Sequence, residues 1–308
     1  MKIVGFKVGL ALGGGAARGL AHLGVLKALS EAGIPIHVIT GTSIGAIVAS
    51  IYAANPDADA VIHQVESYLN SDDFNQTKLD FIRKSDQESD GKLGQLKKMI
   101  KTGFFLAISM RRSSFISEEN IRSNLEKIIP SKNIEDCPLA LGLVSMNLDD
   151  GKEVVFHKGN LIDKVLASCA IPGIFPPVFI DEQMLVDGSW VNPVPVTIAR
   201  QLGADFVIAV DVAPTMNQGD HDFNGWNISL RANEGSRVAL KDQCLRSADH
   251  VLSLNDIDIH WADFLQLDKC VAEGEQVVLQ EIEALKKKTF WSRLQPRFIR
   301  RKYGIGSG

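Results

Sequence analysis

The order of strands and helices can be read from the spacing of the hydrophobic residues. Two short runs of aliphatic and β-branched residues, 8–12 and 36–40, predict buried strands. Between them, leucine recurs at every third position over 20–29, which predicts one buried face of an α-helix. A small-residue pattern over 44–54 predicts a second helix. Strands that alternate with helices in this way indicate an α/β protein with a mostly parallel central sheet.

The same alternation continues toward the C-terminus. The further predicted elements are a hairpin over 139–157, a helix over 160–169, a strand over 184–187, a helix over 194–202 and a strand over 205–211. Residues 229–288 are predicted to be mainly helical and to cover one side of the sheet. We therefore expect one large α/β domain over 1–212, with an insertion at about 70–130, and a mainly helical C-terminal extension over 213–308.

The first predicted strand runs directly into a glycine-rich loop, Gly13-Gly14-Gly15-Ala16-Ala17-Arg18-Gly19, and a helix follows at once. Such a loop points successive backbone N–H groups at one spot beside a helix N-terminus, where negative charge is favoured. Arg18 is informative because a cation in a first helical turn opposes the helix dipole unless an anion lies nearby. The loop therefore predicts a site for a phosphate or an oxyanion.

A dinucleotide site is the rival interpretation of this loop, because Gly13-x-Gly15 opens like the Rossmann fingerprint. The pattern departs from that fingerprint at Arg18, which replaces the third glycine. In addition, the next strand leads into Gly41-Thr42-Ser43 and not into the acidic residue that binds a ribose. Nucleotide binding and a tight turn without a ligand both stay open as lesser alternatives.

A nucleophile elbow is predicted at residues 41–45, which read Gly-Thr-Ser-Ile-Gly between a predicted strand and a predicted helix. In an elbow the serine occupies a strained strand-to-helix turn, and the flanking glycines, Gly41 and Gly45, let the two backbones approach. By chance alone, a Gly-x-Ser-x-Gly motif is expected in roughly one in ten chains of this length. The motif points to a serine acyl hydrolase with Ser43 as the nucleophile.

Two later stretches make the chain recognisable. They read Ala170-Ile171-Pro172-Gly173-Ile174-Phe175-Pro176-Pro177-Val178 and Leu185-Val186-Asp187-Gly188, the second followed by Asn192-Pro193. Together with the glycine loop and the Ser43 motif, they resemble the bacterial patatin-like phospholipases, the group that includes neuropathy-target-esterase-like enzymes. The resemblance covers roughly residues 7–212.

The resemblance implies a three-layer α/β/α fold and a phospholipase A or lysophospholipase that cleaves carboxylic esters of lipids. It implies a catalytic dyad in which Ser43 attacks the ester carbonyl and Asp187, before Gly188, takes the serine proton. The oxyanion hole is then expected from Gly14, Gly15 and Ala16, with Arg18 close by. Each oxyanion donor contributes about 10²–10³-fold and general-base help about 10²–10⁴-fold, so both parts are needed.

Two positions depart from the family pattern. Ala16 stands where a third glycine is common, and Ser189 replaces the glycine or alanine that follows Asp187-Gly188. Neither change removes a reacting group. We expect Ala16 to offer its N–H only if its backbone avoids the positive φ that glycine tolerates.

Three other functions stay open beside the lipid hydrolase. An α/β-hydrolase-type esterase with a histidine triad would use His221, His250 or His260, none of which lies in a recognisable catalytic setting. His22 is expected to pack in a helix or to lie on the surface. A lipid-binding module without activity and a nucleotide-binding protein are the remaining two.

Composition adds few constraints. The chain has 308 residues, of which 45% are hydrophobic and 23% are charged, and a formal net charge of −4. The four cysteines show no metal-ligand spacing, so we expect no metal and no cofactor. We find no signal-peptide pattern and no apolar run of about 18 residues, and we therefore expect a cytoplasmic protein.

Basic residues gather near the C-terminus, where residues 286–302 hold eight lysines and arginines, no acidic residue and several aromatic side chains. Such a segment is typical of one that lies on an anionic membrane, although simple solvation is an equal alternative and nucleic acid is not expected. A second basic amphipathic stretch, residues 93–108, is interpreted as either a lid or an ordinary surface helix. Peripheral membrane association through these two segments is a hypothesis, and the oligomeric state cannot be read.

Overall fold

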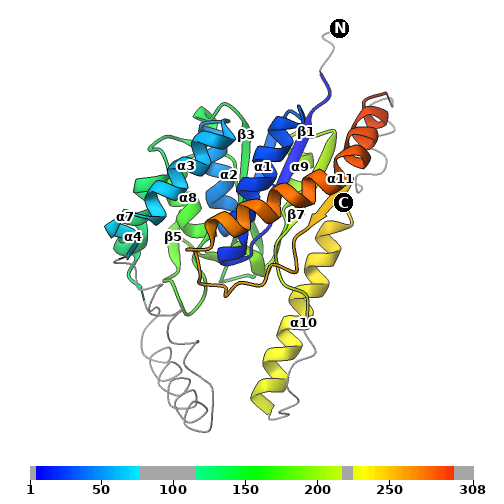
Figure 1. Ribbon diagram of the computed structural model, residues 1–308. Helices are drawn as coiled ribbons and strands as arrows, with labels where there is room; N and C mark the ends of the chain where they lie inside the picture. Colours follow the sequence, from blue (N-terminus) through cyan, green and yellow to red (C-terminus); the bar gives the residue numbers. More distant parts are fainter. Residues whose placement is uncertain (1–4, 76–115, 217–224, 295–308) are drawn as a thin grey trace.

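The protein is built around one mixed β-sheet with helices on both sides (Figure 1). The computed structural model describes residues 5–75, 116–216 and 225–294. Within these residues, eight strands form the sheet: β1 (Val8–Leu12), β2 (Val38–Thr42), β3 (Ala140–Asn147), β4 (Glu153–Phe156), β5 (Val178–Ile180), β6 (Gln183–Asp187), β7 (Phe206–Asp211) and β8 (His250–Ser253). Their order across the sheet is β5-β6-β3-β2-β1-β7-β8, and β4 also pairs with β3.

The centre of the sheet is parallel and its β3 side is antiparallel. β1 lies between β2 and β7, with Leu10 opposite Ile39 on one side and Ile208 on the other. β3 continues the parallel set beside β2, whereas β4, β5 and β6 run antiparallel to their neighbours. Parallel strands end at a common edge, and in open α/β sheets ligands bind at that edge. The carboxyl end of β2 is therefore the place where a site is expected.

The helices form two outer layers, which confirms the predicted three-layer α/β/α fold. The α-helices are α1 (Ala21–Glu31), α2 (Ile44–Ala54), α3 (Ala58–Leu69), α4 (Asp72–Asn75), α7 (Glu118–Ile128), α8 (Leu161–Ser168), α9 (Val196–Gln201), α10 (Gly225–Leu245) and α11 (Leu267–Leu294), and the short 3-10 helices are η1 (Ala16–Leu20), η2 (Ile134–Asp136) and η3 (Gly188–Trp190). The larger core holds apolar side chains of α1, α2, α8 and α11, and the smaller core holds those of α9 and the end of α10.

Most of the predicted elements are present, with two differences near the site. β2 continues to Thr42, two residues beyond the predicted strand end, so the strand runs directly into Ser43. The sheet also contains β5, which the pattern of hydrophobic residues does not predict. β5 has only three residues, and Phe179 in its middle is 69% exposed, so it carries no period that could be recognised.

Residues after 212 extend the same sheet and cover it. β8 pairs parallel with β7, and α11 packs along α1. The two helices approach closely at Gly24 of α1 and Gly274 of α11, which have no side chains. A Cβ on Gly274 would lie 2.1 Å from the carbonyl oxygen of Ala21. An ion pair of 2.8 Å between Lys27 and Glu275 joins the helices further along. The predicted C-terminal extension is thus packed against the α/β domain.

Candidate active site

Ser43 lies in the tight turn between β2 and α2. β2 ends at Thr42 and α2 begins at Ile44, and Ser43 between them has φ 57° and ψ −125°. A positive φ in a non-glycine residue is strained by about 1–3 kcal/mol and persists only where the surrounding structure holds it. This strand–turn–helix context is the one that a nucleophile elbow requires.

The two motif glycines let the strand, the helix and the glycine loop touch. A Cβ on Gly41 would lie 2.2 Å from the carbonyl oxygen of Gly45, and a Cβ on Gly45 would lie 2.3 Å from that of Leu12. Any side chain at either position would therefore overlap backbone atoms. The spacing of glycines around Ser43 follows from this close contact, which is needed to hold the turn in its strained conformation.

Asp187 reaches Ser43 across the intervening strand β3. Thr42 of β2 pairs with Val144, and Asp187 at the end of β6 pairs with the next residue of β3, Ser145. Asp187 is only 3% exposed, and the side chain of Ser43 lies close enough to its carboxylate to lower the pKa of that group. The structure thus brings together the two residues that the sequence pattern singled out as nucleophile and base.

The Asp187 carboxylate is buried but well supplied with donors. Burial raises its pKa, while hydrogen bonds from Ser43 and Ser189 and the positive charge of Arg237 act in the opposite direction. The backbone N–H of Ser189 donates to Asp187 Oδ1 at 2.8 Å. A carboxylate with a raised pKa is a better base than one in water, because it binds a proton more readily.

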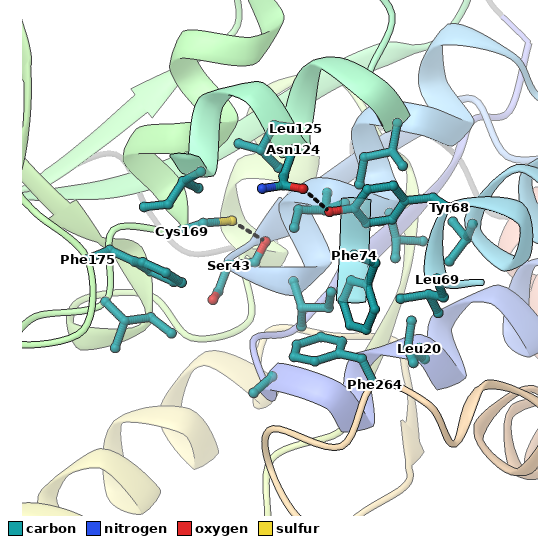
Figure 2. Close-up of a pocket in the computed structure, with 18 of the residues that line it drawn as sticks. Leu20, Ser43, Tyr68, Leu69, Phe74, Asn124, Leu125, Cys169, Phe175 and Phe264 are labelled. Atoms are coloured by element: carbon teal, nitrogen blue, oxygen red, sulfur yellow. Dashed lines mark hydrogen bonds between the residues drawn. The ribbon is translucent and has the colours of Figure 1, made fainter. Parts of the chain in front are cut away.

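Two neighbouring residues at the end of α8 hold the backbone of Ser43. Ser168 Oγ accepts the Ser43 N–H at 3.1 Å and donates to the carbonyl of Val144 at 2.6 Å. Cys169 Sγ donates to the carbonyl of Ser43 at 3.2 Å (Figure 2). Sequence analysis missed the role of Ser168, although the residue directly precedes Cys169 and the recognised proline-rich stretch. Burial raises the pKa of the Cys169 thiol well above its usual range, so this thiol is a donor and not a nucleophile.

Replacing Ser168 by alanine should loosen the turn around Ser43. The change leaves the Ser43 N–H and the Val144 carbonyl without their buried partner, which we expect to lower the free energy of unfolding by about 1–3 kcal/mol. Chemical denaturation of the variant measures this loss. Ser50→Ala is the matched control, because Ser50 is also buried but its hydroxyl has no hydrogen-bond partner among the described residues. Equal stability of the two variants would contradict the assigned role.

Two groups of the expected oxyanion hole already make hydrogen bonds within the protein. The N–H of Gly14 donates to the carbonyl of Pro193 at 3.0 Å, so it is occupied by the protein itself. The Arg18 guanidinium donates to the carbonyls of Ile257 and Ile259 at 3.3 and 3.0 Å, and so ties the loop to the segment after β8. Both groups were expected at the oxyanion. The single N–H of Gly14 is already occupied, and two of the five guanidinium donors of Arg18 bind backbone carbonyls.

The N–H groups of Gly15 and Ala16 remain as candidate oxyanion donors. Within the described part of the chain neither donates to a protein acceptor. Ala16 lines the cavity that contains Ser43, and its φ is 51°. It therefore adopts the positive φ that was set as excluding its N–H, yet that N–H has no protein acceptor among the described residues, so the condition was too strict. A left-handed alanine costs about 1–2 kcal/mol, which explains why glycine suits this position.

Ser43 opens into a large apolar cavity (Figure 2). The cavity has an empty volume of about 1110 Å³, part of which is open to solvent. Its walls come from η1, α2, α3, α4, α7, the proline-rich stretch and the segment between β8 and α11. They include Leu20, Val48, Leu69, Leu125, Phe175 and Phe264. Few polar groups interrupt this lining. The space therefore suits a flexible hydrocarbon chain better than a polar ligand.

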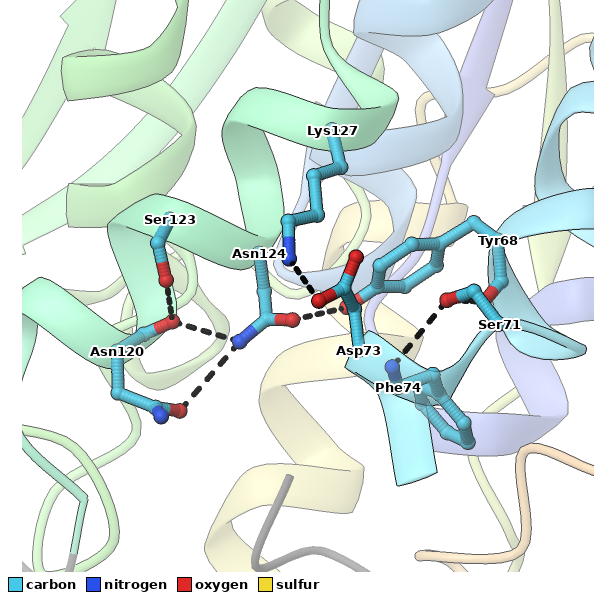
Figure 3. A network of polar contacts seen from close by, with 8 residues as sticks. All are labelled: Tyr68, Ser71, Asp73, Phe74, Asn120, Ser123, Asn124 and Lys127. Atoms are coloured by element: carbon cyan, nitrogen blue, oxygen red, sulfur yellow. Dashed lines mark hydrogen bonds and ion pairs between the residues drawn. The ribbon is translucent and has the colours of Figure 1, made fainter. Parts of the chain in front are cut away.

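A row of polar groups lies where α3, α4 and α7 meet at the cavity (Figure 3). Tyr68 donates its hydroxyl to Asn124 Oδ1 at 2.9 Å, and Asn124 Nδ2 donates to the carbonyl of Asn120 at 2.7 Å. Lys127 and Asp73 form an ion pair of 2.6 Å beside them. These contacts hold α4 to α7, which are the described elements on either side of residues 76–115. The predicted lid or surface helix over 93–108 lies outside the described residues.

No histidine within the described ranges forms a hydrogen bond with Ser43 or Asp187. His22 Nε2 lies 2.8 Å from the carbonyl of Gly13, and burial lowers its pKa to about 4, so the ring is neutral. His250 lies between Glu281 and Lys288 of α11. The His260 ring lies beside that of Trp261 in a tilted arrangement, and its Nδ1 accepts the N–H of Ala262. His221 lies outside the described residues.

The described part of the basic segment, residues 286–294, forms the end of α11. Arg293 lies over the ring of Phe6, which precedes β1, at 5.8 Å from the ring centroid. The segment is therefore at the amino end of β1, whereas Ser43 follows the carboxyl end of the parallel strand β2. Phe290 and Trp291 are 58% and 57% exposed. In the described ranges, no helix has the length and apolar character needed to cross a membrane.

Comparisons with known proteins agree with this geometry. Residues 10–200 match the model of the family described as patatin-like phospholipase. The lysophospholipase NTE1 of Kluyveromyces lactis is 31% identical over 238 residues, which cover 76% of this chain and 15% of that protein. The NTE1 lysophospholipase of Coccidioides immitis is 32% identical over 211 residues, covering 68% of this chain and 12% of that protein. The chain thus spans less than a sixth of the length of these curated relatives.

Among solved structures, VipD from Legionella pneumophila aligns with a TM-score of 0.44 at 13% identity, covering 91% of this chain and 67% of that one. The two curated relatives are fungal, so they give no support to the bacterial part of the resemblance. The family itself is confirmed, because its model spans the glycine loop, the Ser43 elbow and Asp187. The chain belongs to the patatin-like phospholipase family.

Proposed function

We propose that this chain is a lipid acyl hydrolase that cleaves a carboxylic ester bond with a Ser43–Asp187 dyad. The observation that carries the proposal is a strained serine placed beside a buried aspartate, across strand β3, at the wall of an apolar cavity. A serine with a positive φ, a base in contact and space for a hydrocarbon chain are the parts that acyl transfer from a lipid needs.

The reaction would proceed in two halves. Ser43 Oγ attacks the ester carbonyl carbon while its proton passes to the Asp187 carboxylate, and the tetrahedral intermediate collapses as that proton goes to the leaving alcohol. Water then attacks the acyl-enzyme, with Asp187 again taking the proton, and the fatty acid leaves as Ser43 regains its hydrogen. The aspartate contacts the serine directly, so no histidine is needed between them.

The negative oxygen of each intermediate needs donors, and the N–H groups of Gly15 and Ala16 are the ones we assign. They belong to the loop that packs beside Ser43, where a Cβ on Gly14 would lie 3.4 Å from Ser43 Cβ. A preorganised pair of backbone N–H groups is worth several kcal/mol in the transition state. Gly14 and Arg18 act indirectly in this proposal, because their hydrogen bonds fix the loop.

The apolar cavity favours a substrate with a long acyl chain. Lysophospholipids are the first class to test, because the fungal relatives are named lysophospholipases. Diacyl phospholipids and neutral glycerides are the other ester-containing lipids that present the same reacting group. The lining of the cavity contacts the chain and not the headgroup, so its chemistry supports an acyl-chain preference more strongly than a headgroup preference.

Release of fatty acid from a lipid panel tests the proposal. Wild type and Ser43→Ala are compared on lysophospholipid, diacyl phospholipid and monoacylglycerol, in micelles and in anionic vesicles. We expect release by wild type only, and covalent labelling of wild type but not Ser43→Ala by a long-chain fluorophosphonate. If the two proteins release equal amounts of fatty acid and both bind vesicles, a lipid-binding module without activity is the better account.

A nucleotide site in the glycine-rich loop is tested separately. Saturable nucleotide binding in a thermal-shift titration would favour that alternative.

A further inference from the structure

Ser189 departs from the family pattern at a position that touches the dyad. It belongs to η3, immediately after Gly188, and its backbone N–H donates to Asp187 Oδ1 at 2.8 Å. The Ser189 side chain also acts on the same carboxylate and lowers its pKa. Glycine or alanine at this position would supply the backbone N–H but not the hydroxyl.

The Ser189 hydroxyl also lies against the glycine loop. A Cβ on Gly14 would lie 2.4 Å from Ser189 Oγ and 3.4 Å from Ser43 Cβ. The hydroxyl therefore sits in the space that the missing side chain of Gly14 leaves open, on the same side of the loop as Ser43.

We propose that Ser189 is a positioning residue for ester hydrolysis, holding the Asp187 carboxylate against Ser43 through its N–H and its hydroxyl. This inference rests on the proposed function of the dyad. In it, the Ser189 N–H binds the buried carboxylate directly, and the hydroxyl groups of Ser189 and Ser43 lie beside it as further donors. Donors placed around one carboxylate restrict its orientation and favour its charged form.

Other groups face the same carboxylate but do not replace Ser189. The Cys169 thiol ends α8 beside Ser43, and the negative charge of Asp187 contributes to its raised pKa. From α10, the Arg237 guanidinium acts on Asp187 through its charge and stacks over the Trp190 ring at 4.8 Å. Among the described residues, Ser189 is thus the residue other than Ser43 whose hydroxyl acts on the carboxylate as a neutral donor.

Removing the hydroxyl should raise the pKa of Asp187, because the hydrogen bond favours the charged form. A hydrogen bond to a charged group corresponds to a pKa change of about one unit or more. The experiment is a titration of protein labelled with ¹³C at the aspartate carboxyl carbon, with the Asp187 signal assigned by its absence in Asp187→Asn. We expect the apparent pKa to rise by about one unit in Ser189→Ala, and to stay at the wild-type value in Ser189→Thr and in the control Ser50→Ala.

Kinetics supplies a second readout. The acid limb of kcat/KM on a soluble short-chain ester should move to higher pH in Ser189→Ala, because the base works only when deprotonated. An unchanged Asp187 titration in a folded Ser189→Ala would overturn the inference. Absence of ester turnover by wild type would instead count against the proposed function, and the carboxyl titration would still decide the role of Ser189.

Discussion

Asp187→Asn is expected to lower kcat for ester hydrolysis by about 10³-fold, within the range of a lost general base. The asparagine side chain keeps the size of the aspartate but has no charge to accept the Ser43 proton. Fatty-acid release under saturating substrate measures the effect. Asp149→Asn, the same chemical change in an exposed hairpin turn, is the control and should keep wild-type turnover.

The same variant should be at least as stable as wild type at neutral pH. Burial raises the folded-state pKa of Asp187 above its unfolded value. A carboxyl group of this kind stabilises the fold below its unfolded pKa of about 3.9, and that contribution is lost as the pH rises through the folded pKa. At pH 7 the buried, charged carboxylate therefore destabilises the fold, and asparagine removes this destabilisation. A thermal melt should show an equal or higher Tm.

An Asp187→Asn variant that retains most of the wild-type activity would exclude Asp187 as the base.

Filling the apolar cavity should change the preferred chain length while the chemistry survives. In Leu125→Trp, the indole would occupy part of the space beside α7, where Leu125 is 5% exposed and lines the cavity. If four methylene groups of the acyl chain lose their burial, the loss is about 3 kcal/mol, or somewhat more than 100-fold. We expect that reduction in kcat/KM for a C16 lysophospholipid and a change of less than about threefold for a C4 ester.

The measured quantity is the ratio of kcat/KM for the C16 lysophospholipid to that for the C4 ester. A ratio is needed because overpacking also destabilises a core by about 1–3 kcal/mol, which would lower both values. Leu279→Trp on the exposed side of α11 is the matched control, because Leu279 is 62% exposed and outside the cavity lining. It should leave the ratio unchanged. Equal losses on long and short esters in a folded Leu125→Trp would mean that the chain does not bind in this cavity.

The location of the basic C-terminal segment changes how its membrane hypothesis is tested. Its described residues lie near Phe6 at the amino end of β1, while Ser43 follows the carboxyl end of β2. A membrane contact through α11 would thus be made from a different part of the domain than the one that holds the dyad. Vesicle binding and hydrolysis should therefore be measured separately in variants of this segment.

The sequence alone determined the local features of the fold and of the site. The strand–turn–helix order around Ser43 follows from short-range patterns, because a turn that brings backbones within van der Waals contact accepts only glycine at Gly41 and Gly45. The exact end of β2 does not follow from them, since the strand continues two residues further than predicted. The alternation of buried strands with amphipathic helices likewise predicted the α/β layers. The short strand β5 escaped prediction because three residues carry no period.

Tertiary structure alone decided which groups meet. Asp187 reaches Ser43 only because β3 lies between β2 and β6, and strand order across a sheet is not encoded in any local pattern. The same holds for the donors of the glycine loop, since the N–H of Gly14 is taken by Pro193 and Arg18 by carbonyls after β8. Hydrogen bonds between distant segments depend on how the chain packs as a whole, so the residue types predicted the chemistry and the fold selected the atoms available for it.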